Sequence, residues 1–188
     1  PLSGVLRLPG VRSVLAATLI FVLAHNILYT YLAPFLQSVQ LSDRISTVLL
    51  VFGIASLLGI WLVGITIDRW LRVGALLSTL LFALAMILLQ WGGGSPTVIM
   101  MAVVLWGLAF GGAPSLFQTA LAKTADDSAD VAQSMLVTAW NIAIAGGGAA
   151  GAAILTGFGP GLFAPTLLTL LAFTWWTIWR AKRHGFKA

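Results

Sequence analysis

The 188-residue chain is 60% hydrophobic and only 8% charged, and it contains no cysteine. Soluble domains carry about 25% charged residues, so a water-soluble core is excluded and the lipid bilayer is the expected solvent. The missing cysteine excludes disulfides and Cys-ligated metal sites.

Charge-free stretches separated by turn residues predict six transmembrane helices. In chain order, the helices are expected at residues 14–36, 46–67, 73–91, 97–122, 131–156 and 162–179. The runs GGGSP at 92–96 and GFGPG at 157–161 each divide a stretch too long for a single span. Helices satisfy their own backbone hydrogen bonds in lipid, and the alternation typical of strands is absent. We therefore expect an all-α membrane protein with one domain over residues 1–188.

Basic residues divide unequally between the two sides that these spans define. One side receives Arg7, Arg12, Arg69, Arg72, Lys123, Arg180, Lys182, Arg183 and Lys187. The other side receives Arg44 alone. Because cytoplasmic loops carry the excess of Lys and Arg, both ends of the chain are expected in the cytoplasm. The net charge of +5 is then mainly a topology signal, and nucleic acid is not an expected partner.

Polar side chains within the expected spans are candidates for a substrate cavity, because polar groups in a membrane are costly and often functional. The candidates are His25, Asn26, Tyr29, Gln118, Thr138 and Asn141. His25 and Tyr29 are four residues apart and share a helix face. His25 alone among the intramembrane side chains titrates near neutral pH, so it is a candidate proton carrier. The alternative for all these residues is hydrogen bonding between helices without contact to substrate.

The spans differ in the side chains that they offer for packing. The fifth contains GGGAAGAA at 146–153, in which Gly147 and Gly151 are four residues apart. Small residues at this spacing let two helix backbones approach closely. The third span, at 73–91, is nearly pure hydrocarbon, which suits a helix that faces lipid.

The stretch GITIDRWLR at 64–72 places an acid and an Arg side by side where an apolar run ends. It resembles the loop signature of the Major Facilitator Superfamily: a Gly, three residues, Asp-Arg/Lys, one residue, Gly and a basic pair. The matching residues are Gly64, Asp68, Arg69 and Arg72. Leu71 stands where the family often has Gly, and Val73 where a second basic residue often follows. Such a degenerate copy is typical of the loop between helices eight and nine of that family.

Three further segments are similar to helices seven, ten and eleven of bacterial drug- and sugar-efflux members. They are LYTYLAPFL at 28–36, LWGLAFGGAPSLFQTALAK at 105–123 and AWNIAIAGGGAAGAA at 139–153. The resemblance implies the C-terminal half of a twelve-helix transporter, built from two inverted three-helix repeats. The echo between APFLQ at 33–37 and APSLFQ at 113–118 fits such repeats. The N-terminal six-helix half would be the partner, and the first residue, Pro1, suits a piece cut from a longer chain.

The resemblance also implies a function. Small molecules such as a drug, a sugar or a nucleoside-like compound would leave the cell by alternating access, in exchange for protons, across the bacterial inner membrane. No cofactor or metal would be needed, since the proton gradient drives transport. Asp68 would latch the cytoplasmic side against the other half without touching substrate. The alternatives are uptake of a small metabolite and a structural or pore subunit that does not transport.

A membrane enzyme is not expected. The chain has no HExxH motif and no carboxylate pair within a span. Its one acidic cluster, Asp126, Asp127 and Asp130, stands just before the fifth span, where carboxylates favour a helix start.

Overall fold

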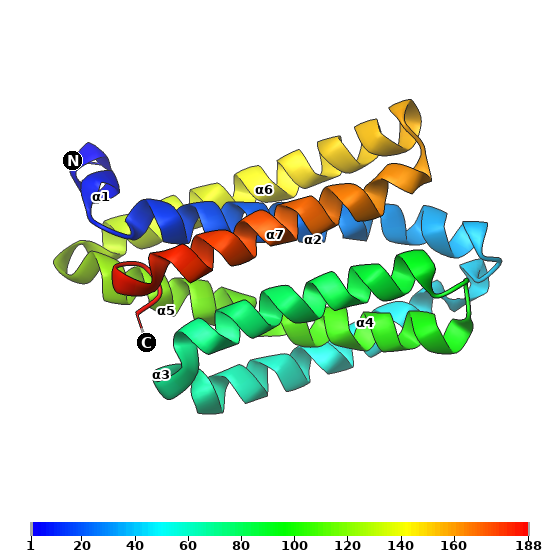
Figure 1. Ribbon diagram of the computed structural model, residues 1–188, viewed down its shortest axis with the longest axis horizontal. Coiled ribbons are helices and arrows are strands. Elements are labelled where there is room, and N and C mark those ends of the chain that lie inside the picture. Colours follow the sequence, from blue (N-terminus) through cyan, green and yellow to red (C-terminus); the bar gives the residue numbers. More distant parts are fainter. Residues whose placement is uncertain (1, 188) are drawn as a thin grey trace.

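The computed structural model describes residues 2–187 and is 91% helical, with no strand in that range (Figure 1). The expected all-helical class is confirmed. The α-helices are α1 (Leu2–Arg7), α2 (Val11–Ser38), α3 (Ile45–Trp91), α4 (Pro96–Gly111), α5 (Ala113–Ala125), α6 (Ala129–Gly157) and α7 (Phe163–Arg180). Short 3-10 turns are η1 (Ser42–Arg44), η2 (Asp126–Ser128), η3 (Pro160–Leu162) and η4 (Ala181–Arg183).

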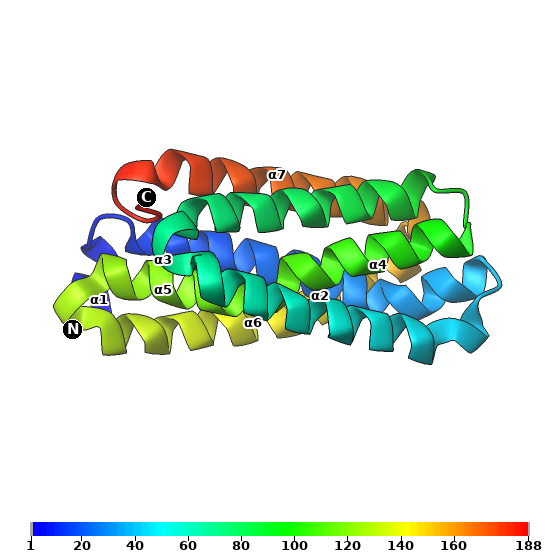
Figure 2. The ribbon, with the colours of Figure 1, turned by 90° about the horizontal axis from the view of Figure 1, so that it is seen from below.

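Four helical stretches of the described chain are long and apolar enough to cross a membrane. They are Val11–Ser38, Ser42–Trp91, Pro96–Gly157 and Pro160–Arg183. The second and third are 50 and 62 residues long, more than twice the ~20 residues that one crossing requires. Each of these two stretches changes direction within its length, as Figures 1 and 2 show.

Helix α3 reverses direction at Trp70, where the backbone leaves helical geometry with φ −128° and ψ 27°. The reversal divides α3 into a first arm, residues 45–69, and a second arm, residues 71–91. The sequence predicted two helices separated by residues 68–72, but those residues remain helical on either side of Trp70. The tight turn is held by Arg72, whose guanidinium donates a hydrogen bond to the Trp179 carbonyl oxygen at 3.0 Å, near the end of α7.

The helix expected at 97–122 is two helices, and this is a correction. Helix α4 ends at Gly111 and α5 begins at Ala113, with Pro114 in the first turn of α5. Proline lacks the N–H that would continue the helix, and its ring clashes with the preceding turn. The two glycines at the break allow close approach of the first arm of α3. A side chain on Gly111 would collide with the Ser56 carbonyl, and one on Gly112 with the Val63 side chain.

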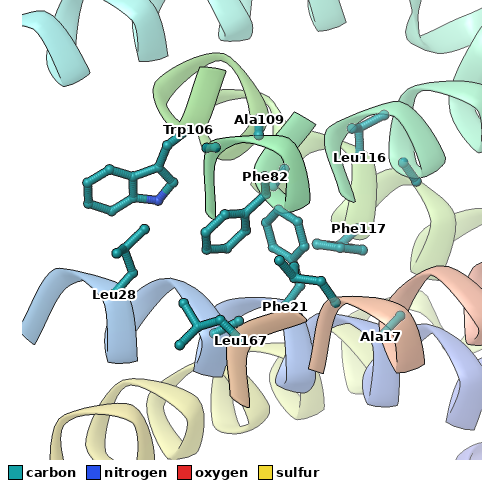
Figure 3. Packing of buried hydrophobic residues seen from close by; sticks show 14 of the residues in the cluster. Ala17, Phe21, Leu28, Phe82, Trp106, Ala109, Leu116, Phe117 and Leu167 are labelled. Carbon is teal, nitrogen blue, oxygen red and sulfur yellow. The ribbon is translucent and has the colours of Figure 1, made fainter. Parts of the chain in front are cut away.

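The helices form two packed groups around a shared core. Helix α2 packs mainly on α6 and α7, whereas α3 packs mainly on α4. At the junction Phe21 of α2 lies between Phe82 and Phe117, with ring centroids 5.5 Å apart in both pairs (Figure 3). Dispersion contacts of this kind hold helices together where lipid is as apolar as the side chains.

The ends of the elongated bundle differ in charge. Both described ends of the chain lie at one end of the long axis, together with the reversals at Trp70 and η2 (Figure 1). The connections at 39–44, 92–95 and 158–162 lie at the other end. The nine basic residues that the sequence assigned to one side of the membrane are therefore carried by elements that meet at one end of the bundle, here called the basic end. Arg44 is the only basic residue assigned to the opposite end.

The two arms of α3 expose different amounts of apolar surface. The first arm buries only Val48, Ala55 and Gly59. Its outward face exposes Leu50, Ile54, Leu57, Leu58, Ile60, Trp61, Leu62 and Ile65. The second arm buries one continuous face that includes Phe82, so its hydrocarbon character serves the core as well as the surface. Such broad exposed apolar faces are normal only where lipid or another protein covers them.

Candidate substrate site and gating loop

His25 is the centre of an aromatic cluster between α2, α3 and α4. The Trp106 indole Nε1–H donates a hydrogen bond to His25 Nδ1 at 3.0 Å. The Phe110 ring stacks on the imidazole, with centroids 3.5 Å apart and planes 7° apart. Phe52 completes the cluster at 5.9 Å from the imidazole centroid. Because Trp106 is fully buried, its N–H needs a partner, and His25 provides one across 81 residues of sequence.

Tyr29 extends this cluster towards the surface. It lies one turn beyond His25 on α2, with ring centroids 6.0 Å apart, and half of its surface is exposed. The expected pairing of His25 and Tyr29 on one face is therefore seen. Tyr29 offers a ring and a hydroxyl at the edge of the cluster, whereas His25 lies within it.

Gln118 and Asn141 meet in a pocket of about 340 Å³ between α5 and α6. Pro114, Leu136, Val137 and Trp140 complete its lining. Helix α6 is tied to α5 here, because Gln133 Nε2 donates to the Gln118 carbonyl oxygen at 2.9 Å. The Trp140 ring of this pocket lies 6.2 Å from the Phe110 ring of the His25 cluster, so the two sites adjoin.

The other two cavity candidates lie elsewhere. Asn26 faces the contact between α2 and α6, where a side chain on Gly147 would collide with Asn26 Cβ. Its Nδ2 donates to the Val22 carbonyl of its own helix at 2.9 Å. Thr138 is exposed on α6, does not line the pocket, and donates to the Ser134 carbonyl at 3.0 Å. Neither residue joins Gln118 and Asn141.

The two glycines that the sequence predicted for close packing, Gly147 and Gly151 of α6, both lie against α2. A Cβ on Gly151 would be 3.1 Å from Thr30 Cβ. These two positions bring the backbones of α2 and α6 together along the wall that carries Asn26.

The four residues of the loop signature lie around the reversal of α3. Gly64 lies in open space, and Asp68 and Arg69 are exposed. Arg72 is half-buried. Its Nε has no hydrogen-bond partner in the described structure, whereas one of its two terminal nitrogens, Nη2, donates to the Trp179 carbonyl. Asp68 therefore presents its carboxylate at the basic end of the bundle.

Sequence reasoning missed the aromatic members of the site. Phe52 and Phe110 flank His25, and Trp140 lines the pocket with Gln118 and Asn141, but none of the three was predicted as a site residue. The spacing of Trp106 and Phe110, four apart in LWGLAF, was the available signal. A larger pocket of about 650 Å³ lies at the opposite end, beside Arg44 and α4, and its lining is mostly apolar. Among residues 2–187, no group of three or more His, Asp or Glu is placed to hold a metal ion.

Comparison with known proteins identifies relatives that include an efflux pump. A purine ribonucleoside efflux pump, NepI, of Salmonella paratyphi B is 29% identical over 168 residues, which cover 88% of this chain and 42% of the pump. NepI of Salmonella typhimurium matches equally. A protein of Pseudomonas aeruginosa named transcription regulatory protein OpdE is 29% identical over 173 residues, covering 90% of this chain and 43% of that protein. No family model and no solved structure matches.

The chain thus spans less than half the length of these relatives. Its apolar helices and efflux-pump relatives indicate a membrane protein that is not an enzyme, as the sequence predicted.

Proposed function

We propose that this chain is the C-terminal six-helix half of a Major Facilitator Superfamily transporter, and that the full-length protein exports small molecules by alternating access. The similarity to NepI over 88% of the chain carries this proposal. The six transmembrane helices would be α2, the first arm of α3, the second arm of α3, α4 and α5 together as one helix, α6, and α7. Their length and the concentration of basic residues at one end support a multi-pass protein of the bacterial inner membrane with both ends of the chain in the cytoplasm.

The packing supports two three-helix units whose helices pack across the boundary between the units. The first unit is α2 with the two arms of α3, and the second is α4 with α5, α6 and α7. In the first unit, α2 packs on α6 and α7, the second and third helices of the other unit. In the second unit, α4 packs on the first arm of α3, where Gly107 lies against Ala55, and α5 packs on the second arm, where Gly74 lies against Leu116. Inverted repeats of transporters place their substrate sites at the interface between repeats.

The geometry at His25 supports proton coupling. An imidazole whose Nδ1 accepts the Trp106 hydrogen bond is unprotonated at that nitrogen, whereas an imidazolium has only donors. Protonation would therefore break the bond that joins α2 to α4. Ring faces attract a cation, and the aromatic side chains around His25 would partly offset the loss of water. Tyr29 is the only other titratable group in the cluster.

Asp68 is proposed to act at the gate and not on the substrate. It stands exposed at the basic end and is not among the residues that line the pocket at Gln118 and Asn141. In the full-length protein its carboxylate would pair with the positive N-terminal end of a helix in the N-terminal half, which closes the cytoplasmic side.

The experiment is export by the full-length protein in bacteria that lack their own exporters. We expect lower accumulation of a labelled purine nucleoside, the substrate class in the relatives' name, and recovery of accumulation when a protonophore collapses the gradient. A drug and a sugar are assayed in parallel. Raised accumulation would indicate uptake instead, and no change with any compound would favour a structural subunit.

A further inference from the structure

We propose that the pocket between α5 and α6 recognises an uncharged, planar heterocycle, with Trp140 as the stacking surface and Gln118 and Asn141 reading its hydrogen-bonding edge. This inference rests on the proposed transport function and adds the chemical class of the substrate.

The charge of the pocket selects for neutral ligands. Its six lining residues are Pro114, Gln118, Leu136, Val137, Trp140 and Asn141, none of which is ionisable near neutral pH. A phosphate or an ammonium group placed here would lose water without gaining a counter-charge, which is strongly unfavourable. The pocket therefore favours a nucleoside or a free base over a nucleotide or a cationic drug.

The two amides supply directional recognition. Gln118 is exposed, and its hydrogen bond from Gln133 uses the backbone carbonyl, so the side-chain amide keeps a donor and an acceptor for a ligand. Asn141 Nδ2 donates to the Val137 carbonyl at 3.0 Å, which orients the amide and leaves Oδ1 as an acceptor. A side-chain amide presents a donor next to an acceptor, the pattern that pairs with the edge of a nucleobase.

Trp140 supplies the flat surface. It lies next to Asn141 in sequence, lines the same pocket, and is backed by the Phe110 ring at 6.2 Å. Stacking of a base on an aromatic side chain is tolerant of which base it is and contributes on the order of tenfold or more in affinity. The volume of about 340 Å³ is at the low end of the range for small-molecule pockets, which suits a single small ring system.

The test measures binding of radiolabelled inosine to the purified full-length protein in detergent. We expect Trp140→Leu, which keeps apolar bulk and removes the large ring, to weaken binding about tenfold, and Trp140→Phe to retain most of the affinity. Gln118→Leu and Asn141→Leu should each weaken binding by about tenfold, because they leave base-edge groups unpaired. Thr156→Val, on α6 but outside the pocket, is the matched control and should bind like wild type.

Competition defines the class of ligand. Unlabelled adenosine and hypoxanthine should displace inosine, whereas ribose and inosine monophosphate should not. Each variant is also checked for a monodisperse elution profile and thermal unfolding, so that loss of binding is separated from loss of fold.

Several outcomes would overturn the inference. Wild-type affinity in folded Trp140→Leu and Gln118→Leu proteins would do so, as would equal competition by the monophosphate or by ribose. If the wild-type protein exports a drug or a sugar but binds no heterocycle, this inference fails while the proposed export function stands. Export of no compound at all would instead remove the proposed function.

Discussion

Nδ1 of His25 accepts the Trp106 hydrogen bond that connects α2 with α4, and in the proposed mechanism the same nitrogen receives the proton. Asn places its Oδ1 close to the position of the imidazole Nδ1, accepts from Trp106 and does not titrate. We therefore predict that His25→Asn folds normally and exports without dependence on the pH gradient. Export is measured in vesicles with and without an imposed gradient.

His25→Leu is the companion variant. It leaves the buried Trp106 N–H without its acceptor, and we expect a loss of about 1 kcal/mol in stability, the scale of hydrogen bonds between membrane helices. If His25→Asn keeps the full gradient dependence of the wild type, His25 is not the proton carrier.

Asp68 is exposed, and the proposed latch requires a contact with the N-terminal half. We predict that Asp68→Asn reduces export severalfold while membrane insertion, followed by the amount of protein in washed membranes, stays unchanged. Asp43→Asn, an exposed acid at the opposite end of the bundle, is the control. Normal export by Asp68→Asn would remove the latch from the mechanism.

At the scale of elements, adjacent glycines of α6 should respond in opposite directions. A Cβ on Gly147 would collide with Asn26, so Gly147→Ala must force α6 away from α2, at a cost of about 1–3 kcal/mol. Gly148 faces open space, and Gly148→Ala should be neutral or stabilising by up to about 1 kcal/mol, because Ala is the better helix former. Thermal unfolding in detergent measures both variants, and equal unfolding temperatures would contradict the close helix contact.

The segment after α7 closes the basic end of the bundle. Phe186 is fully buried, 6.2 Å from the Phe117 ring, and Thr124 donates a hydrogen bond to the Gly185 carbonyl at 2.9 Å. These contacts connect α5 with the segment that follows η4, beside the start of α2 at Gly10.

We predict that Phe186→Ala lowers stability by about 3 kcal/mol, as deletion of a buried ring does. Lys187→Ala, one residue further and exposed, should leave stability unchanged. The temperature at which the monodisperse elution peak is lost is the measurement. Equal temperatures for the two variants would show that the segment does not hold the end together.

At the scale of the whole molecule, the charge difference between the two ends predicts the orientation. The chain has no cysteine, so single-cysteine reporters inserted into it are specific. Asp127→Cys, at the basic end, should react with a membrane-impermeant maleimide only after the cells are opened. Ser42→Cys, at the opposite end, should react in intact cells. In a full-length background without other cysteines, the reverse labelling pattern would invert the topology.

The sequence by itself determined what depends on composition and local chemistry. The low charge content indicated a membrane protein, in which helices satisfy the backbone hydrogen bonds. The runs GGGSP and GFGPG correctly marked the connections between α3 and α4 and between α6 and η3. Pro114 was a sequence signal for the break at Gly112. The break was not predicted because the apolar run around it has the length of one transmembrane helix.

Only the tertiary structure decided which polar residues meet. Asn26 and Gln118 look alike in a list of intramembrane polar residues, yet one faces a helix contact and the other a pocket. The partner of His25 is 81 residues away, and no local pattern selects it. Contacts of this kind depend on how two helices approach and rotate against each other, and that is determined by the packing of the whole bundle.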